Sequence, residues 1–185
     1  MDDVTELLRR AREHDRAAID ELVAILYPDL RRMAQARLAQ NGTITLLDTS
    51  VMVNESYLRL ANAERIDATC RGQFLAYAAQ VMRSVIVDFA RKRRAERRGG
   101  AAEHVTLTTE LLDGEVGSDD DIERVHEALN ELQKTDPRLK AVVEMRYFGG
   151  FDENEIAEAL GVAVRTVRRD WERARLLLLV ALKRG

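Results

Sequence analysis

The sequence predicts an all-α fold of two small helical domains joined by a flexible acidic linker. Apolar residues recur at three- and four-residue spacing along most of the 185 residues, as on one face of a helix. The alternation of β-branched residues that indicates strands is nearly absent. A glycine-containing acidic stretch interrupts the helical pattern near the middle of the chain. We therefore expect domains over residues 1–98 and 122–185, with residues 99–121 as the linker.

The first two helices are predicted over residues 5–13 and 15–40. The second carries an apolar stripe, which favours burial of one of its faces. Pro28 lies inside this stripe, and we expect it to kink or restart the helix because proline lacks an amide hydrogen. The Asn-Gly pair at residues 41–42 is a typical helix stop.

The third and fourth helices are predicted over residues 50–62 and 71–98. Asp48, Thr49 and Ser50 are the candidate N-caps of the third helix. Its apolar face is expected to contain Val51, Tyr57, Leu58 and Leu60. The fourth helix begins with an apolar stripe and ends in a basic run, so we expect its first part to be core and its end to be exposed.

The charge of the chain is unevenly distributed, which the net value of −3 conceals. Residues 71–98 contain eight Lys and Arg against two Asp and Glu, and residues 164–185 contain seven against two. Between them, residues 99–123 contain eight acidic residues and no Lys or Arg. Such an acidic stretch without an apolar stripe predicts a flexible tether. Because binding to nucleic acid depends on local neutralisation of phosphates, the negative net charge does not exclude DNA as a ligand.

Four helices are predicted in the second domain. The first spans about residues 122–133, and the next begins at Pro137 and ends at the Gly-Gly pair of residues 149–150. A third helix, over residues 153–160, starts with the Asp-x-x-Glu pattern of a capping box. The last helix spans about residues 164–183.

The last two helices are predicted to form a helix-turn-helix. Ala157 is small enough for a close helix crossing, Gly161 suits a tight turn, and Val167 packs back against the preceding helix. One face of the last helix collects the apolar side chains Val164, Val167, Trp171, Ala174 and Leu178. The opposite face collects Arg165, Thr166, Arg169 and Arg173, with Arg168 and Arg175 on its flanks. A cationic helix face of this kind suits phosphates and guanine edges in a major groove.

The composition also excludes several classes of protein. No apolar run approaches the roughly 20 residues of a membrane span, and the acidic N-terminus lacks the features of a secretory signal, so we expect a cytoplasmic protein. Cys70 is the single cysteine, and His14, His104 and His126 are scattered, so no disulfide, metal site or cofactor is expected. No cluster of acids, histidines and nucleophiles predicts an enzyme.

Three segments resemble the extracytoplasmic-function (ECF) group of bacterial sigma factors, the dissociable subunits that give RNA polymerase its promoter choice. Residues 48–60 (DTSVMVNESYLRL) are similar to the helix that docks on the polymerase clamp. Residues 73–94, which end in VDFARKRR, are similar to the segment that recognises and opens the −10 element. Residues 155–175 resemble the helix-turn-helix that reads the −35 element. The resemblance covers nearly the whole chain.

The resemblance implies three sets of contact residues. Polymerase would be contacted by Asp48, Val51, Asn54, Glu55, Tyr57 and Leu58. The −10 region would be contacted by Arg83, Asp88, Arg91, Lys92, Arg93 and Arg94. The −35 element would be contacted by Arg165, Thr166, Arg168, Arg169 and Arg173. For Asp88 two alternatives remain, because it either pairs with Arg91 or Lys92 on its own helix or contacts a partner.

The function implied by the resemblance is promoter-specific transcription initiation without enzymatic activity of the chain itself. The expected partners are promoter DNA and core RNA polymerase, through the clamp of its largest subunit and the flap of its second subunit. Many members are held by an anti-sigma factor, which is a further candidate partner. The alternative is an autonomous helix-turn-helix regulator, which would bind a two-fold symmetric operator without polymerase.

Overall fold

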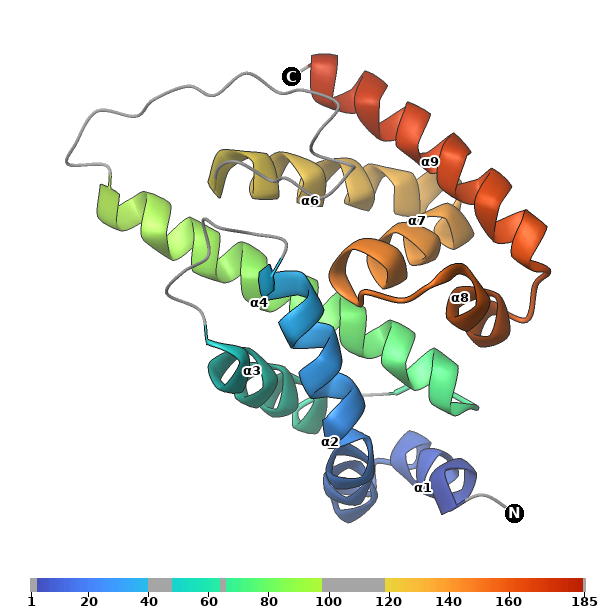
Figure 1. The fold of residues 1–185 in the computed structure, drawn as a ribbon. Helices are drawn as coiled ribbons and strands as arrows, with labels where there is room; N and C mark the ends of the chain where they lie inside the picture. Colours follow the sequence, from blue (N-terminus) through green and yellow to red (C-terminus); the bar gives the residue numbers. More distant parts are fainter. Residues whose placement is uncertain (1–2, 40–47, 64–65, 98–118, 185) are drawn as a thin grey trace.

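A computed structural model of the protein describes residues 3–39, 48–63, 66–97 and 119–184 (Figure 1). These residues form helices and connecting turns, which confirms the predicted all-α class. The elements are α1 (Asp3–Arg12), α2 (Arg16–Ala39), α3 (Thr49–Ala61), α4 (Arg71–Arg97), α6 (Asp119–Thr135), α7 (Pro137–Val143), η1 (Glu144–Phe148), α8 (Glu153–Leu160) and α9 (Val164–Arg184). None of the described helices combines the length and the apolar composition that a bilayer span requires.

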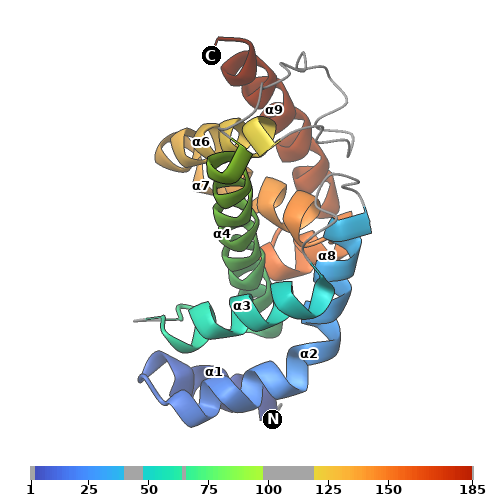
Figure 2. The same ribbon diagram turned by 90° about the vertical axis from the view of Figure 1, so that its left-hand side faces the viewer.

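The long helix α4 lies between the N-terminal helices α1 to α3 and the C-terminal helices α6 to α9 (Figures 1 and 2). It contacts α2 and α3 on one side and α6, η1 and α8 on the other. Its apolar residues are buried around most of the helix: Phe74, Leu75, Ala78, Ala79, Val81, Met82, Val85, Ile86, Val87 and Ala90. We predicted a single apolar stripe, and this prediction was incomplete because α4 packs against partners on opposite sides.

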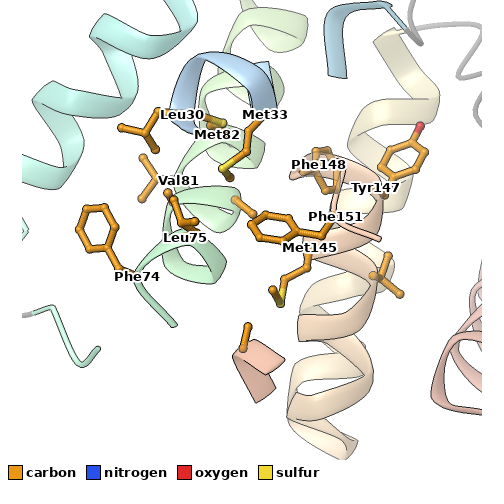
Figure 3. Close-up of a cluster of buried hydrophobic side chains, with 14 of the residues drawn as sticks. Leu30, Met33, Phe74, Leu75, Val81, Met82, Met145, Tyr147, Phe148 and Phe151 are labelled. Carbon is orange, nitrogen blue, oxygen red and sulfur yellow. The ribbon is translucent and has the colours of Figure 1, made fainter. Parts of the chain in front are cut away.

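The apolar residues on the two sides of α4 form one continuous core. Figure 3 shows Met33 of α2 and Met82 of α4 near Phe148 of η1 and Phe151, which follows η1. The N-terminal helices and the C-terminal helices are thus packed together in this structure. The predicted linker lies almost entirely outside the described residues, so the division into residues 1–98, 99–121 and 122–185 stays a prediction.

Most of the helix ends follow local signals that the sequence contains. The Asp48 carboxylate accepts a hydrogen bond from the Ser50 amide at 3.2 Å and caps α3. The Asp152 carboxylate accepts from the Glu155 amide at 2.9 Å, and the Glu155 carboxylate accepts from the Asp152 amide at 2.8 Å. This reciprocal pair is the predicted capping box of α8. The glycines predicted to stop helices at residues 42 and 99–100 lie outside the described residues.

Two helices differ from their predicted course. α2 continues through Pro28 as one helix rather than restarting, and Figure 2 shows that its course bends midway. The helix that begins at Pro137 changes at Glu144 into the π-helical turn η1, which ends at Gly149. This π turn was not predicted, because a local insertion into the helical ladder does not alter the apolar spacing enough to be recognised.

Candidate nucleic-acid interface

The helix-turn-helix is built by α8, the turn at Gly161 and α9. Gly161 has φ 65° and ψ 35°, a left-handed conformation that glycine adopts without steric cost. The Val162 amide donates to the Ala157 carbonyl at 3.0 Å and closes the turn. The Ala163 carbonyl then accepts from the Thr166 amide at 2.8 Å, which starts α9. These local bonds fix the direction in which α9 leaves the turn.

One face of α9 is buried, as the sequence predicted. Val167, Trp171, Ala174 and Leu178 are buried, and Val164 is half-buried. The Arg146 guanidinium lies 4.6 Å from the centre of the Trp171 ring, which covers the ring with a cation. The prediction that Trp171 is a core residue rather than a base contact is therefore consistent with its burial.

The opposite face of α9 is cationic and exposed. Arg165, Arg168, Arg169 and Arg173 are exposed, and Thr166 is half-buried. The Arg169 side chain retains 72% of its accessible surface, and its Nε lies 3.7 Å from Asp170 Oδ1. Arg173 Nη1 lies 3.6 Å from Asp136 Oδ2. Four arginines therefore project from the helix that the turn orients.

Two acidic residues hold arginines around the helix-turn-helix. Arg168 Nε donates to Glu153 Oε2 at 2.6 Å, and this hydrogen bond lowers the pKa of Glu153. Asp170 is buried in spite of its place in a basic helix, because Arg138 of α7 donates to it at 2.6 Å. Asp170 thus anchors α9 to α7, and Glu153 fixes the orientation of Arg168.

The basic end of α4 contacts α6 through a shared carboxylate. Arg91 Nε donates to Glu123 Oε1 at 2.9 Å, and Arg94 Nη1 donates to Glu123 Oε2 at 2.7 Å. Partial burial raises the pKa of Glu123, but the hydrogen bonds from Arg91 and Arg94 outweigh this effect and lower it overall. Lys92 is exposed, whereas Arg93 is buried, so the prediction of a fully exposed basic end is wrong for Arg93.

Arg83 lies in a buried polar cluster rather than on the surface. Its Nε is 3.0 Å from Glu144 Oε1, and its Nη1 is 3.2 Å from His126 Nδ1. Lys140 Nζ lies 3.5 Å from the same oxygen of Glu144. Burial raises the pKa of Glu144 against the opposing charges of Arg83 and Lys140. For His126, burial and then the charges of Arg83 and Arg91 lower the pKa.

Asp88 pairs with neither of the two residues on its own helix that the sequence suggested. It is exposed and accepts a hydrogen bond from Arg59 Nη2 of α3 at 2.7 Å. Arg59 also donates to Ser84 Oγ at 2.7 Å. These two bonds attach α3 to α4 and help to fix the orientation of α3 relative to α4.

The exposed face of α3 carries two large apolar side chains. Val51 and Leu58 retain 44% and 49% of their accessible surface, so the predicted apolar face of this helix is only partly buried, and both side chains are accessible to a partner. The buried face instead consists of Met52, Val53, Ser56, Leu60 and Ala61. Asp48, Asn54 and Glu55 are exposed beside them, and the half-buried Tyr57 donates to Asp20 at 3.0 Å. Exposed apolar residues rimmed by polar ones are typical of a protein-binding surface.

Sequence reasoning missed three polar residues that contact the basic side of α4. Glu123, His126 and Glu144 come from α6 and η1 and are far from α4 in sequence. A signal was present only for Glu144, which stands in an apolar run four residues after Lys140. A carboxylate at this spacing from a lysine inside an apolar stripe indicates a buried ion pair.

Comparison with protein families identifies a match over almost the whole chain. The family model described as ECF sigma factor matches residues 1–184 of the chain. No curated protein matches the chain at a significant level.

Proposed function

The chain belongs to the ECF sigma factor family and so has a sigma-factor role in transcription initiation. From this premise we propose which partner each of its three surfaces binds. The arginine face of α9 reads the duplex of the −35 element. The basic end of α4 contacts the −10 region. The exposed face of α3 binds core polymerase. The chain supplies recognition and the polymerase supplies the chemistry, so neither a catalytic residue nor a cofactor is assigned.

The observation that carries this proposal is the division of α9 into a buried and a cationic face. Trp171 and its neighbours bury one face, and Arg165 and Arg169 project from the other at the start of the helix. A recognition helix places its first turns in the major groove, where a guanidinium forms two hydrogen bonds with guanine O6 and N7. The exposure of Arg165 and Arg169 in the first turns of α9 supports the assignment of such contacts to them.

The three surfaces lie on different elements, which supports a function that requires polymerase. A single helix face of this size gives modest affinity for DNA. When polymerase holds α3 at a promoter, α4 and α9 are held close to the promoter DNA. Their weak contacts with the DNA then combine into a higher overall affinity, because the effective concentration of each surface near its site is high. We expect this assembly in the cytoplasm, and an anti-sigma factor stays a candidate partner of the free chain.

The test uses the full chain with purified core RNA polymerase. Co-purification and run-off transcription from genomic DNA fragments are expected to identify promoters that core polymerase alone does not use. The same fragments are then titrated with the chain alone in a mobility-shift assay. Tight binding of a two-fold symmetric duplex without polymerase would overturn the proposal and favour the autonomous regulator. Failure to associate with polymerase would also overturn it.

A further inference from the structure

Arg168 lies on the flank of the arginine face of α9 that borders α8, and a carboxylate of α8 binds it. Its Nε donates to Glu153 Oε2 at 2.6 Å. We propose that Glu153 is a positioning residue that determines specificity at the −35 element: it keeps Arg168 away from the phosphate backbone and directs the outer edge of its guanidinium at a base pair. This inference rests on the proposed function of α9 and concerns a residue outside the three predicted contact sets.

Arg168 differs from the other exposed arginines of α9 in its contacts. The ion pairs of Arg169 and Arg173 are longer, at 3.7 and 3.6 Å, and exceed the length of a hydrogen bond. Arg165 forms no ion pair within the part of the chain that the structure describes. Arg168 is therefore held in place, although 67% of its side-chain surface remains accessible to a ligand.

Glu153 is itself held from its other side. Its Oε1 lies 3.5 Å from Arg146 Nη1, and the Arg146 guanidinium lies over the buried Trp171 ring, 4.6 Å from the ring centre. The hydrogen bond from Arg168 is the main cause that lowers the pKa of Glu153; partial burial opposes it, and Arg146 adds to it. The carboxylate is therefore charged at neutral pH, and contacts from two sides fix its position.

The contact with Glu153 leaves the terminal edge of the Arg168 guanidinium available. A guanidinium is planar and carries five N–H donors, one on Nε and two on each terminal nitrogen. Glu153 accepts from Nε, and the described residues give Nη1 and Nη2 of Arg168 no hydrogen bond. These two nitrogens form the fork that matches guanine O6 and N7. The contact thus leaves Arg168 the donors that a base contact requires.

The charge of Glu153 also disfavours the competing contact with a phosphate. The first helix of a helix-turn-helix crosses the DNA backbone, and Glu153 is the first residue of α8. An arginine on this flank without a carboxylate would bind a phosphate, and a phosphate contact carries no sequence information. The carboxylate repels a phosphate at short range but not a neutral base edge. Glu153 therefore acts against sequence-independent binding, which raises specificity.

Fixing the side chain in advance reduces the cost of binding through it. A free arginine side chain loses much rotamer freedom when it is immobilised on DNA, and a side chain that is already held loses less. An ion pair with an exposed member contributes little to the stability of a fold. Loss of the contact between Glu153 and Arg168 is therefore expected to change DNA selection and to leave folding nearly unchanged.

Three variants and a matched control test this role. Glu153→Gln keeps the size of the side chain and removes its charge, Arg168→Ala removes the guanidinium, and the double variant combines both changes. Glu158→Gln is the control, because Glu158 is exposed on the same helix and forms no ion pair with a residue that the structure describes. Arg169→Ala is added as a variant of the proposed −35 surface that does not involve Glu153.

The experiment uses the full chain assembled with core polymerase and a promoter mapped by run-off transcription. Competition binding compares the promoter duplex with duplexes in which one base pair of the −35 element is changed at a time. Arg168→Ala is expected to lose about tenfold of discrimination at one base pair. Glu153→Gln is expected to lose discrimination at the same base pair and to bind the changed duplexes more tightly than the wild type does.

The salt dependence gives a second measurement. Without the carboxylate Arg168 is free to bind a phosphate, so the plot of log affinity against log salt concentration is expected to steepen by about 0.9 for Glu153→Gln. The double variant is expected to match Arg168→Ala, because Glu153 acts through Arg168. Glu158→Gln is expected to show the discrimination of the wild type. Melting followed by circular dichroism is expected to be the same for all these variants.

Several results would overturn the inference. Wild-type discrimination by Glu153→Gln at the base pair identified with Arg168→Ala would show that Glu153 does not position Arg168. Equal changes for Glu153→Gln and Glu158→Gln would show an effect of net charge. A lower melting temperature of Glu153→Gln, with discrimination reduced at every base pair, would show a structural role.

The outcomes also separate this inference from the proposed function. If Arg169→Ala loses discrimination at a −35 base pair while Arg168→Ala and Glu153→Gln lose none, the −35 assignment of α9 stands and the role of Glu153 is overturned. If neither Arg168→Ala nor Arg169→Ala changes discrimination at any −35 base pair, the proposed function of α9 fails, and the inference fails with it.

Discussion

Arginines with the same predicted role lie in three different environments. Arg169 is exposed to solvent, Arg91 shares a carboxylate of α6, and Arg83 is buried against Glu144. A buried guanidinium is costly to leave without its carboxylate, whereas an exposed one has little effect on stability. Substitutions at these positions are therefore expected to change different quantities: DNA affinity at Arg169, the contact between α4 and α6 at Arg91, and folding at Arg83.

Arg169→Ala is expected to weaken binding of the −35 duplex by about 1–3 kcal/mol, because a bidentate hydrogen bond from arginine to guanine contributes about this much binding free energy. The loss is measured as the affinity of the polymerase-bound chain for promoter duplexes, together with run-off transcription. Lys134→Ala is the control, since Lys134 is exposed on α6 and pairs only with Glu131 among the described residues. Equal effects of the two substitutions would show that Arg169 acts only through net charge.

His126 is expected to make stability depend on pH. Its pKa is lower in the folded chain than the ordinary value of 6.5, because burial and the charges of Arg83 and Arg91 oppose protonation, while Asp88 and Glu123 favour it. A lowered pKa means that the neutral ring is preferred in the native state. The stabilisation is complete above the unfolded-state pKa and is lost as the pH falls through the folded value.

The measurement is urea unfolding of wild type and of His126→Gln between about pH 7 and about pH 5. The wild-type free energy of unfolding is expected to fall more steeply with acidification than that of His126→Gln. His14→Gln serves as the control because His14 is exposed on the surface. Parallel curves for wild type and His126→Gln would contradict the prediction.

At the scale of the helices, the sequence predicted what depends on neighbours along the chain. The burial of Trp171 follows from spacing alone, and the structure confirms it. Of the three candidate caps of α3, the structure selects Asp48. The pairing of Glu123 with α4 was not predictable, because it joins residues 29 and 32 positions apart that no periodicity relates. Spacing alone also did not separate the exposed Val51 from the buried Leu60, since an apolar side chain on a docking surface has the same spacing as one in the core.

The face of α3 is expected to act in binding and not in folding. Replacing Val51 and Leu58 together by serine is expected to leave the free energy of unfolding within about 0.5 kcal/mol of wild type, because both side chains are already exposed. Affinity for core polymerase is expected to fall at least tenfold, or about 1.4 kcal/mol. The measurement is fluorescence anisotropy of labelled chain titrated with core polymerase.

The control for α3 is Ile25→Ser on α2, which removes a similarly exposed apolar side chain from another helix. If the double variant binds polymerase as tightly as the wild type does, α3 is not part of the polymerase-binding surface. A loss shared with Ile25→Ser would indicate a broader apolar contact that includes α2.

At the scale of the whole molecule, the continuous core couples helices that the sequence assigns to separate domains. α4 supplies core residues to both sides, so unfolding of one side removes the support of the other. We therefore expect a single cooperative transition for the described residues in the free chain. Two independent domains would instead unfold in two steps.

Leu22→Ala tests this coupling. Leu22 is fully buried in α2, and its truncation is expected to cost about 2–5 kcal/mol. Trp171 is the only tryptophan of the chain and lies in α9, so its fluorescence reports on the C-terminal helices. Coupled halves shift the Trp171 midpoint together with the circular dichroism midpoint. A Trp171 midpoint equal to that of wild type would contradict the prediction.

The burial of α4 on opposite sides has a consequence for solubility. Detachment of the C-terminal helices would expose on α4 a stripe on the side of Gly72 that includes Ala79, Ile86 and Ala90, all buried in this structure. Water-exposed apolar stripes of this kind promote self-association at the concentrations used for purification. Variants that weaken the packing of the C-terminal helices on α4 are therefore expected to precipitate sooner on concentration than the wild type.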